Sequence, residues 1–197
     1  MNTENEEKEL VNRACRGDMS AFQELVERYK KKIYYLAFDM VGDHHEAEDL
    51  SQEVFIKAFR FIKKFRKEAK VSSWLYRIAV NTCIDAQRKK SSKPQVSMEN
   101  EQLESAFLAS NRRDEDISIS EPERLAGAEI VQERIRRMLG GISPRERSVF
   151  ILRYYNEFGV KEIAAVLKVS SNTIKSLLLR ARRKLKKELL STGGYPL

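Results

Sequence analysis

The sequence lacks a long hydrophobic run, and it contains few cysteines. No stretch reaches the roughly 18 apolar residues of a membrane-spanning helix, so membrane insertion is not expected. The acidic opening residues MNTENEEKEL have no apolar core, so no signal peptide is expected. Cys15 and Cys83 share no motif, which predicts reduced thiols in a cytoplasmic protein; a disulfide between them is the alternative.

The residues that covalent chemistry needs are also missing. The sequence has no glycine-rich phosphate loop, no His/Cys set with zinc spacing and no convincing pair of nucleophile and base. His44 and His45 are adjacent, so on a helix they point in different directions and make a poor metal pair. We therefore predict no metal site, no cofactor and no enzymatic activity.

Positive charge is abundant and unevenly placed. The formal net charge is +8. Residues 60–90 carry ten Lys or Arg against two acids, and residues 161–190 carry nine against two. Residues 91–123 reverse this balance, with eight acids against three cations. Two basic blocks around an acidic connector predict two modules that contact nucleic acid.

Apolar residues recur at helical spacing, and no useful length alternates as a strand would, so we predict an all-α fold. Residues 1–7 are expected to be frayed, with a short helix after them that stops at Gly17. A second helix should begin near Asp18, with Ser20 and Gln23 as a capping box, and end at Gly42. A third should follow the cap Asp43.

The third helix carries a polar surface with two interpretations. Acids such as Glu46 and Glu48 suit the positive end of a helix dipole. Asp49, Gln52 and Glu53 share one face, which could instead dock a basic or polar partner helix. Composition alone favours the first interpretation.

The block KVSSWLYRIAVNTCIDAQRKK holds the single Trp. Trp74 alone is more often a core residue than a stacking platform. Its neighbours Tyr76, Arg77 and Asn81, predicted to be partly exposed, add the aromatic, amide and guanidinium groups of a surface that binds single strands.

Residues 93–121 lose the helical pattern and read as a flexible acidic linker between two domains. Beyond it, one helix should end at Gly140-Gly141. Ser143, followed by Pro144 and Glu146, then predicts a complete helix start.

The most informative stretch is GVKEIAAVLKVSSNTIKSLLLRARRKLKKEL, which predicts a helix-turn-helix. Lys168 and Val169 form the turn, and Ser170 or Ser171 caps the second helix. A buried stripe and an opposite basic face are expected on that helix. The stripe is Ile174, Leu178, Ala181 and Leu185; the face is Lys175, Ser176, Leu179, Arg180 and Arg183. Cations for phosphates and polar groups for base edges favour DNA binding over a merely solvated basic helix.

Three motifs occur in order: HEAEDLSQEVFIKAF, SSWLYRIAVNTCIDAQRKK and SPRERSVFILRYYNEFGVKEIAAVLKVSSNTIKSLLLRARRKL. Together they resemble a bacterial RNA polymerase sigma factor of the extracytoplasmic-function (ECF) group. The resemblance implies a region 2 domain over 8–92, the linker 93–121 and a region 4 domain over 122–190, with the helix-turn-helix at about 160–179.

The resemblance also implies roles. Polymerase binding falls on Asp49, Leu50, Gln52, Glu53 and Phe55. Recognition and melting of the promoter −10 element fall on Ser73, Trp74, Arg77, Asn81, Arg88, Lys89 and Lys90, with a flipped base held between Asn81 and a loop from Arg88 to Lys93. Reading of the −35 element falls on Ser171, Asn172, Thr173, Lys175, Ser176, Leu179, Arg180 and Arg183. The expected partners are core RNA polymerase, promoter DNA and an anti-sigma protein.

Four positions depart from the family pattern. Val71 stands where the family often has Phe, and Leu177 where it often has Arg. Asn172 and Lys168 stand where the family usually has Gly. We expect these changes to affect the −35 preference more than the fold. The competing interpretations are a helix-turn-helix regulator that acts without polymerase and, less favoured, a nucleic-acid-processing enzyme.

Overall fold

The computed structural model describes residues 3–65, 70–92 and 137–191, and within these ranges every regular element is a helix. The first domain contains α1 (Thr3–Cys15), α2 (Met19–Val41), α3 (His44–Phe61), the short 3-10 helix η1 (Ile62–Lys64) and α4 (Val71–Ser92). The second domain contains α6 (Pro144–Tyr154), α7 (Val160–Leu167) and α8 (Ser171–Ser191). The predicted all-α fold is confirmed.

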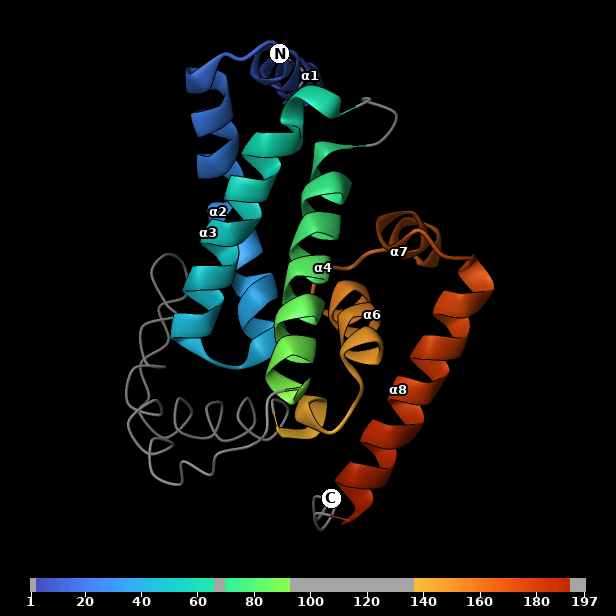
Figure 1. Cartoon of the computed structure of the whole chain (residues 1–197). Coiled ribbons are helices and arrows are strands. Elements are labelled where there is room, and N and C mark those ends of the chain that lie inside the picture. Colours follow the sequence, from blue (N-terminus) through green and yellow to red (C-terminus); the bar gives the residue numbers. More distant parts are fainter. Residues whose placement is uncertain (1–2, 66–69, 93–136, 192–197) are drawn as a thin grey trace, which may run out of the picture.

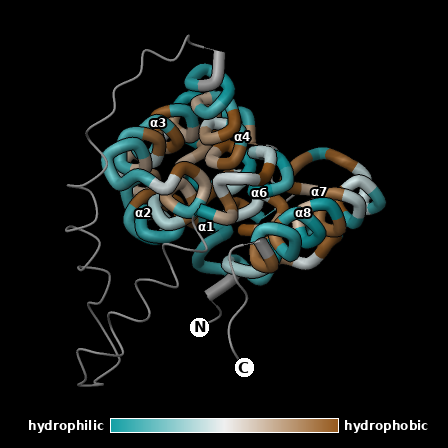
Figure 2. Tube along the Cα trace, turned by 90° about the horizontal axis from the view of Figure 1, so that it is seen from below, coloured by the Kyte–Doolittle hydropathy of each residue, from teal (hydrophilic) through white to brown (hydrophobic). Residues whose placement is uncertain are grey.

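In the first domain, the long helices α2, α3 and α4 run side by side, with α1 across one end (Figure 1). Their core is built from large apolar side chains with almost no exposure, among them Ile33, Leu36, Phe38 and Val54. Hydrophobic and hydrophilic stretches alternate along the helices (Figure 2), as expected when each helix buries one face.

In the first domain, local sequence signals predicted most of the helix ends. Two expectations were wrong. Helix α2 ends at Gly42, whose φ of 81° suits glycine, and Asp43 caps α3 by accepting from the Glu46 amide at 2.8 Å. The cap of α2 is Asp18, which accepts from the Ala21 amide at 3.1 Å, rather than the predicted Ser20 box. An aspartate two residues earlier already satisfies a free amide at the start of the helix.

Helix α1 begins at Thr3, so the expected fraying of residues 1–7 is wrong from residue 3 onward. Two contacts hold this helix in place. Leu10 and Val11 are buried in the core, and the Tyr29 hydroxyl donates to the Glu7 carboxylate. Burial and the nearby Glu7 carboxylate both raise the pKa of Tyr29, so the phenol keeps its proton and donates.

In the second domain, residues 137–140 are helical and end in a turn at Gly141, as predicted. Ser143 then caps α6 with a full capping box: it accepts from the Glu146 amide, and the Glu146 carboxylate accepts from the Ser143 amide at 3.1 Å. Helix α8 packs along α6 and α7 (Figure 1). The predicted linker, 93–121, lies outside the described residues.

The two domains are packed against each other rather than held apart. Helices α6 and α7 lie beside α4, and α6 also contacts α2 (Figure 1). One continuous hydrophobic core runs from Leu10 in α1 to Leu178 in α8. A second, smaller cluster surrounds Leu139, Ile142, Ala181 and Leu185.

Candidate nucleic-acid and protein interfaces

Helix α3 presents the predicted polar face to solvent. Asp49, Gln52 and Glu53 are exposed, while Phe55 is half-buried and packs against the core. Leu50 is only 6% exposed and lies in the core. Its role in polymerase binding stays a prediction; in this structure Leu50 belongs to the buried face that packs α3 on the core.

The α3 face is linked to α4 through one lysine. Lys57 Nζ lies 2.7 Å from a Glu53 carboxylate oxygen and donates to the Thr82 hydroxyl at 3.0 Å. Near the start of α3, Glu46 pairs with Lys90 of α4 at 3.1 Å. Side-chain contacts thus join the helix that carries the polar face to the helix that carries the basic end.

Helix α4 carries the second predicted set. Ser73, Trp74 and Arg77 are half-buried, whereas Asn81 is exposed. The Trp74 ring packs on Phe65 with centroids 5.1 Å apart, which favours its structural interpretation. Tyr76, which we expected to be partly exposed, is buried because it packs against Phe158 of the second domain.

The basic end of α4 differs from the predicted loop. Arg88, Lys89 and Lys90 are exposed on the last turns of a helix that continues to Ser92, and Lys93 lies outside the described residues. Three cations at a helix C-terminus also suit the negative end of the helix dipole.

The helix-turn-helix consists of α7, the turn at Lys168 and Val169, and α8. Lys168 adopts the left-handed conformation, with φ of 53°, at the position where the family usually has Gly. The Ser170 hydroxyl accepts from the Thr173 amide at 3.1 Å, so Ser170 rather than Ser171 caps α8.

Helix α8 has the two faces that its sequence predicts. The stripe Ile174, Leu178, Ala181 and Leu185 is buried. The predicted contact residues Asn172, Thr173, Lys175, Ser176, Leu179, Arg180 and Arg183 are exposed, and Ser171 is half-buried. Leu179 is 50% exposed, unusual for a leucine surrounded by cations. This face offers cations, hydroxyls, an amide and one apolar contact, the groups that read a major groove.

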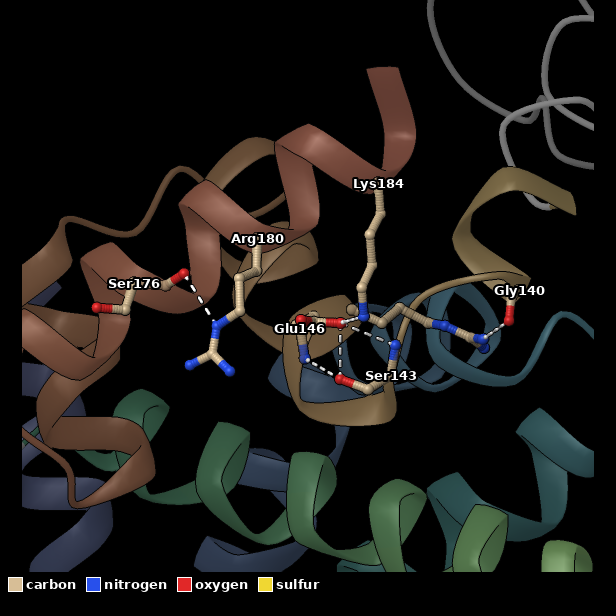
Figure 3. A network of polar contacts seen from close by, with 7 residues as sticks. Gly140, Ser143, Glu146, Ser176, Arg180 and Lys184 are labelled. Carbon is tan, nitrogen blue, oxygen red and sulfur yellow. Dashed lines mark hydrogen bonds and ion pairs between the residues drawn. The ribbon is translucent and has the colours of Figure 1, made fainter. Parts of the chain in front are cut away.

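A buried carboxylate fixes α8 on α6, as Figure 3 shows. Glu146 accepts from Lys184 Nζ at 2.8 Å and from the Ser143 hydroxyl at 2.9 Å. Burial opposes the charge of Glu146, but these hydrogen bonds outweigh it and lower its pKa. The sequence identified the cap, whereas the partner Lys184 looked like one more basic residue of α8.

For metal ligands, membrane spans and disulfides, the structure informs only on the residues that it describes. Across residues 3–65, 70–92 and 137–191, no three His, Cys, Asp or Glu side chains gather as metal ligands. Within those ranges, no helix combines the length and apolar character needed to cross a membrane. Cys15 and Cys83 do not form a disulfide.

Comparison with known proteins places both domains in one family. Residues 25–93 match the model for Sigma-70 region 2, and residues 132–185 match that for Sigma-70, region 4. The chain is 35% identical over 189 residues to the ECF RNA polymerase sigma factor SigW of Bacillus subtilis, covering 92% of this chain and 96% of SigW. It is 31% identical to the RNA polymerase sigma-H factor of Pseudomonas aeruginosa, covering 96% of each chain.

The fold agrees with these matches. A solved structure of CnrH in complex with the cytosolic domain of CnrY is similar, with a TM-score of 0.67, 23% identity, and coverage of 95% of this chain and 99% of that chain. The chain therefore belongs to the ECF group of bacterial sigma factors, which bind core RNA polymerase to start transcription and are not enzymes.

Proposed function

We propose that the exposed face of α3 is the surface that docks on the clamp helices of core RNA polymerase. Asp49, Gln52 and Glu53 would make the contacts, with Phe55 at the edge. Their exposure, while Leu50 is buried, supports this assignment. The acids are too far into α3 to be explained by its N-terminal dipole, which acts mainly in the first turn.

We assign −10 recognition and melting to α4. Asn81 would hold a base of the non-template strand, with Ser73, Trp74 and Arg77 beside it and Arg88, Lys89 and Lys90 on the phosphates. Unstacking a base costs a few kcal/mol, which contacts of this kind must offset. The exposed positions of Asn81 and the three terminal cations support this role.

We assign −35 recognition to α8, and one observation carries this part of the proposal. The residues at base-reading positions are exposed, while the stripe on the other side of the same helix is buried. Lys175, Ser176, Leu179 and Arg180 would enter the major groove, with Arg183 on the backbone. Phosphate contacts would supply salt-dependent affinity, and base contacts would supply specificity.

The family also implies a cellular compartment, a regulatory partner and a role for the linker. We propose that it acts in the cytoplasm and that an anti-sigma protein binds it. The linker 93–121 would pass through the polymerase near the template channel, where its acids mimic nucleic-acid charge. Replacing those acids with Ser should change initiation or promoter escape; unchanged initiation and escape would contradict this role.

Transcription in vitro tests the proposed function as a whole. Core polymerase, the purified chain and fragmented genomic DNA would be combined, and every new start site mapped. We expect discrete starts that share upstream −10 and −35 elements. Absence of starts, together with specific duplex binding by the chain alone, would instead indicate a regulator that works without polymerase.

A further inference from the structure

One lysine of α3 touches both surfaces that the first domain offers to its proposed partners. Lys57 Nζ lies 2.7 Å from a Glu53 carboxylate oxygen, and it donates to the Thr82 hydroxyl of α4 at 3.0 Å. Glu53 belongs to the polar face of α3, and Thr82 follows Asn81, the residue proposed to hold a base. A single ammonium group therefore joins the proposed polymerase surface to the proposed strand-binding helix, which lies beside α3 (Figure 1).

The two contacts of Lys57 differ in how easily they break. Thr82 is 2% exposed, so its buried hydroxyl orients the ammonium group beside α4. The Glu53 side chain is 49% exposed, and ion pairs of this i, i+4 type at a surface contribute little to stability. A competing cation can therefore take the Glu53 carboxylate at little cost, while Lys57 keeps its bond to Thr82.

The position of Thr82 shows where the Lys57 ammonium group lies on α4. Successive residues of a helix are turned by about 100°, so Asn81 lies about 100° around α4 from Thr82, and Lys89 lies only about 20° from it on the same side. Lys89 is exposed, and it lies about two turns, or about 10 Å, further along the axis. Lys57 and Lys89 therefore flank one edge of the face that carries Asn81, at a spacing of about three stacked nucleotides.

A strand on this face of α4 also meets an acid. Asp85 is exposed and lies one turn after Asn81, so it repels phosphates near the proposed base site. A cation beside Asn81 offsets that repulsion, and Lys57 is held there by its bond to Thr82. In the free chain, however, the Glu53 carboxylate neutralises this cation.

We propose that Lys57 is a further phosphate contact for the −10 strand and that Glu53 masks it until the chain docks on polymerase. Docking turns the Glu53 carboxylate to a basic group of the polymerase, and the Lys57 ammonium group loses its neutralising partner. Of its three N–H donors, one stays on Thr82 and the others bind phosphate oxygens. The inference rests on the proposed roles of the α3 face and of α4.

The mask couples the two partners of the chain. The Glu53 carboxylate cannot pair fully with Lys57 and with polymerase at once. Polymerase therefore raises the affinity of the chain for the strand, and the strand raises its affinity for polymerase by the same factor. The free chain binds single strands more weakly than the docked chain does.

The salt dependence of strand binding by the full chain tests the mask. The logarithm of the binding constant falls with the logarithm of the salt concentration by about 0.7 for each phosphate contact to a single strand. The probe is a fluorescent single-stranded oligonucleotide with the non-template −10 sequence of the mapped start sites. We expect Glu53→Gln, which keeps the shape of the side chain but not its charge, to steepen this slope by about 0.7.

Two further variants control this result. Glu24→Gln makes the same charge change in another i, i+4 pair, that of Glu24 with Arg28 on α2, and should leave the slope unchanged. The double variant Glu53→Gln, Lys57→Gln should return to the wild-type slope, because the unmasked cation is gone while Gln still offers a donor to Thr82. A wild-type slope for Glu53→Gln would overturn the mask, and a steep slope for the double variant would overturn the assignment to Lys57.

The same measurement with saturating core polymerase tests the phosphate contact itself. We expect the wild type and Glu53→Gln to share one slope, and Lys57→Gln to be shallower by about 0.7. Lys30→Gln, at an exposed lysine of α2 that pairs with Glu27, is the control. Equal slopes for the wild type and Lys57→Gln, with normal strand binding, would overturn only this inference. A wild-type holoenzyme that does not bind the strand would overturn the proposed role of α4 and the inference with it.

Discussion

The Lys184 ammonium group donates to the Glu146 carboxylate at 2.8 Å, and this pair joins the start of α6 to α8. Glu146 is 4% exposed at its side chain, whereas Lys184 is about half exposed. The orientation of the proposed −35 reader therefore depends on a buried carboxylate that must stay ionised.

The stability of the second domain should accordingly depend on pH. The pKa of Glu146 is lowered in the folded chain, so its stabilisation is complete above the ordinary value of about 4.3 and is lost as pH falls through the lower folded value. Glu146→Gln keeps the capping geometry but removes the charge. At pH 7 we expect it to lower the free energy of unfolding by on the order of 1 kcal/mol.

Thermal unfolding between pH 7 and pH 3 would measure this effect. The deficit of Glu146→Gln relative to the wild type should shrink as pH falls below about 4.3, because the unfolded wild-type chain then takes up a proton that the folded carboxylate resists. A deficit that stays constant across the range would show that its charge does not stabilise the fold.

The turn of the helix-turn-helix carries strain that a single substitution should relieve. Lys168 has φ of 53°, a conformation that costs an ordinary residue roughly 1–2 kcal/mol but suits glycine. Part of this gain is offset by the greater backbone entropy of glycine when unfolded. We expect Lys168→Gly to raise the melting temperature, with a net gain below about 1 kcal/mol. Lys161→Gly, at an exposed position within helix α7, is the control and should lower it.

The Cys83 thiol should be protected from disulfide-exchange reagents in the folded chain. Burial, with smaller effects from nearby Glu46 and Glu53, raises the pKa of Cys83 to about 12, so almost no thiolate forms at pH 8. A disulfide-exchange reagent should modify Cys83 only on unfolding, in the wild type and in Cys15→Ser alike. Rapid labelling of folded Cys15→Ser would contradict the buried placement of Cys83.

Removing the polar face of α3 should weaken polymerase binding. The double variant Asp49→Ala, Gln52→Ala deletes two exposed side chains that the fold does not use as core. We expect a lower affinity for core polymerase, measured by fluorescence anisotropy of labelled chain. Glu6→Ala, Glu9→Ala, which removes two exposed acids of α1, should bind as the wild type does.

Removing one base-reading side chain should weaken −35 recognition. Arg180 is exposed, and among the described residues its Nε donates to the Ser176 carbonyl of its own helix at a long 3.5 Å, so the side chain can turn to a base. We expect Arg180→Ala to cost about 1–3 kcal/mol, or roughly 5- to 150-fold, in −35-dependent initiation. Arg182→Ala is the control, since Arg182 is engaged with the Tyr154 hydroxyl and ring.

Much of the fold could be predicted because the signals are local. The buried stripe on α8 follows from helical spacing, and the Ser143 cap lies three residues from its partner Glu146. The error at Tyr76 has a different cause. Helical spacing gives the direction of the buried face but not its width, which depends on what packs against it.

The interdomain contacts could not be predicted from the sequence. Arg77 donates to the carbonyl of Val166, which is 89 positions away, and a backbone carbonyl is an acceptor that any residue type provides. Arg147, which donates to the Met40 carbonyl of α2, likewise looked like an ordinary cation beside the Ser143 cap. Neither pairing leaves a local pattern, so only the three-dimensional structure reveals that the two arginines reach across the interface.

The most direct test of the account measures polymerase binding and promoter-dependent initiation for two variants in parallel. The account predicts opposite outcomes. Asp49→Ala, Gln52→Ala should lose polymerase affinity, with initiation restored by excess chain, whereas Arg180→Ala should bind polymerase normally and lose −35-dependent initiation at every concentration. Equal loss of both activities in either variant would contradict the assignment of polymerase docking to α3 and −35 recognition to α8.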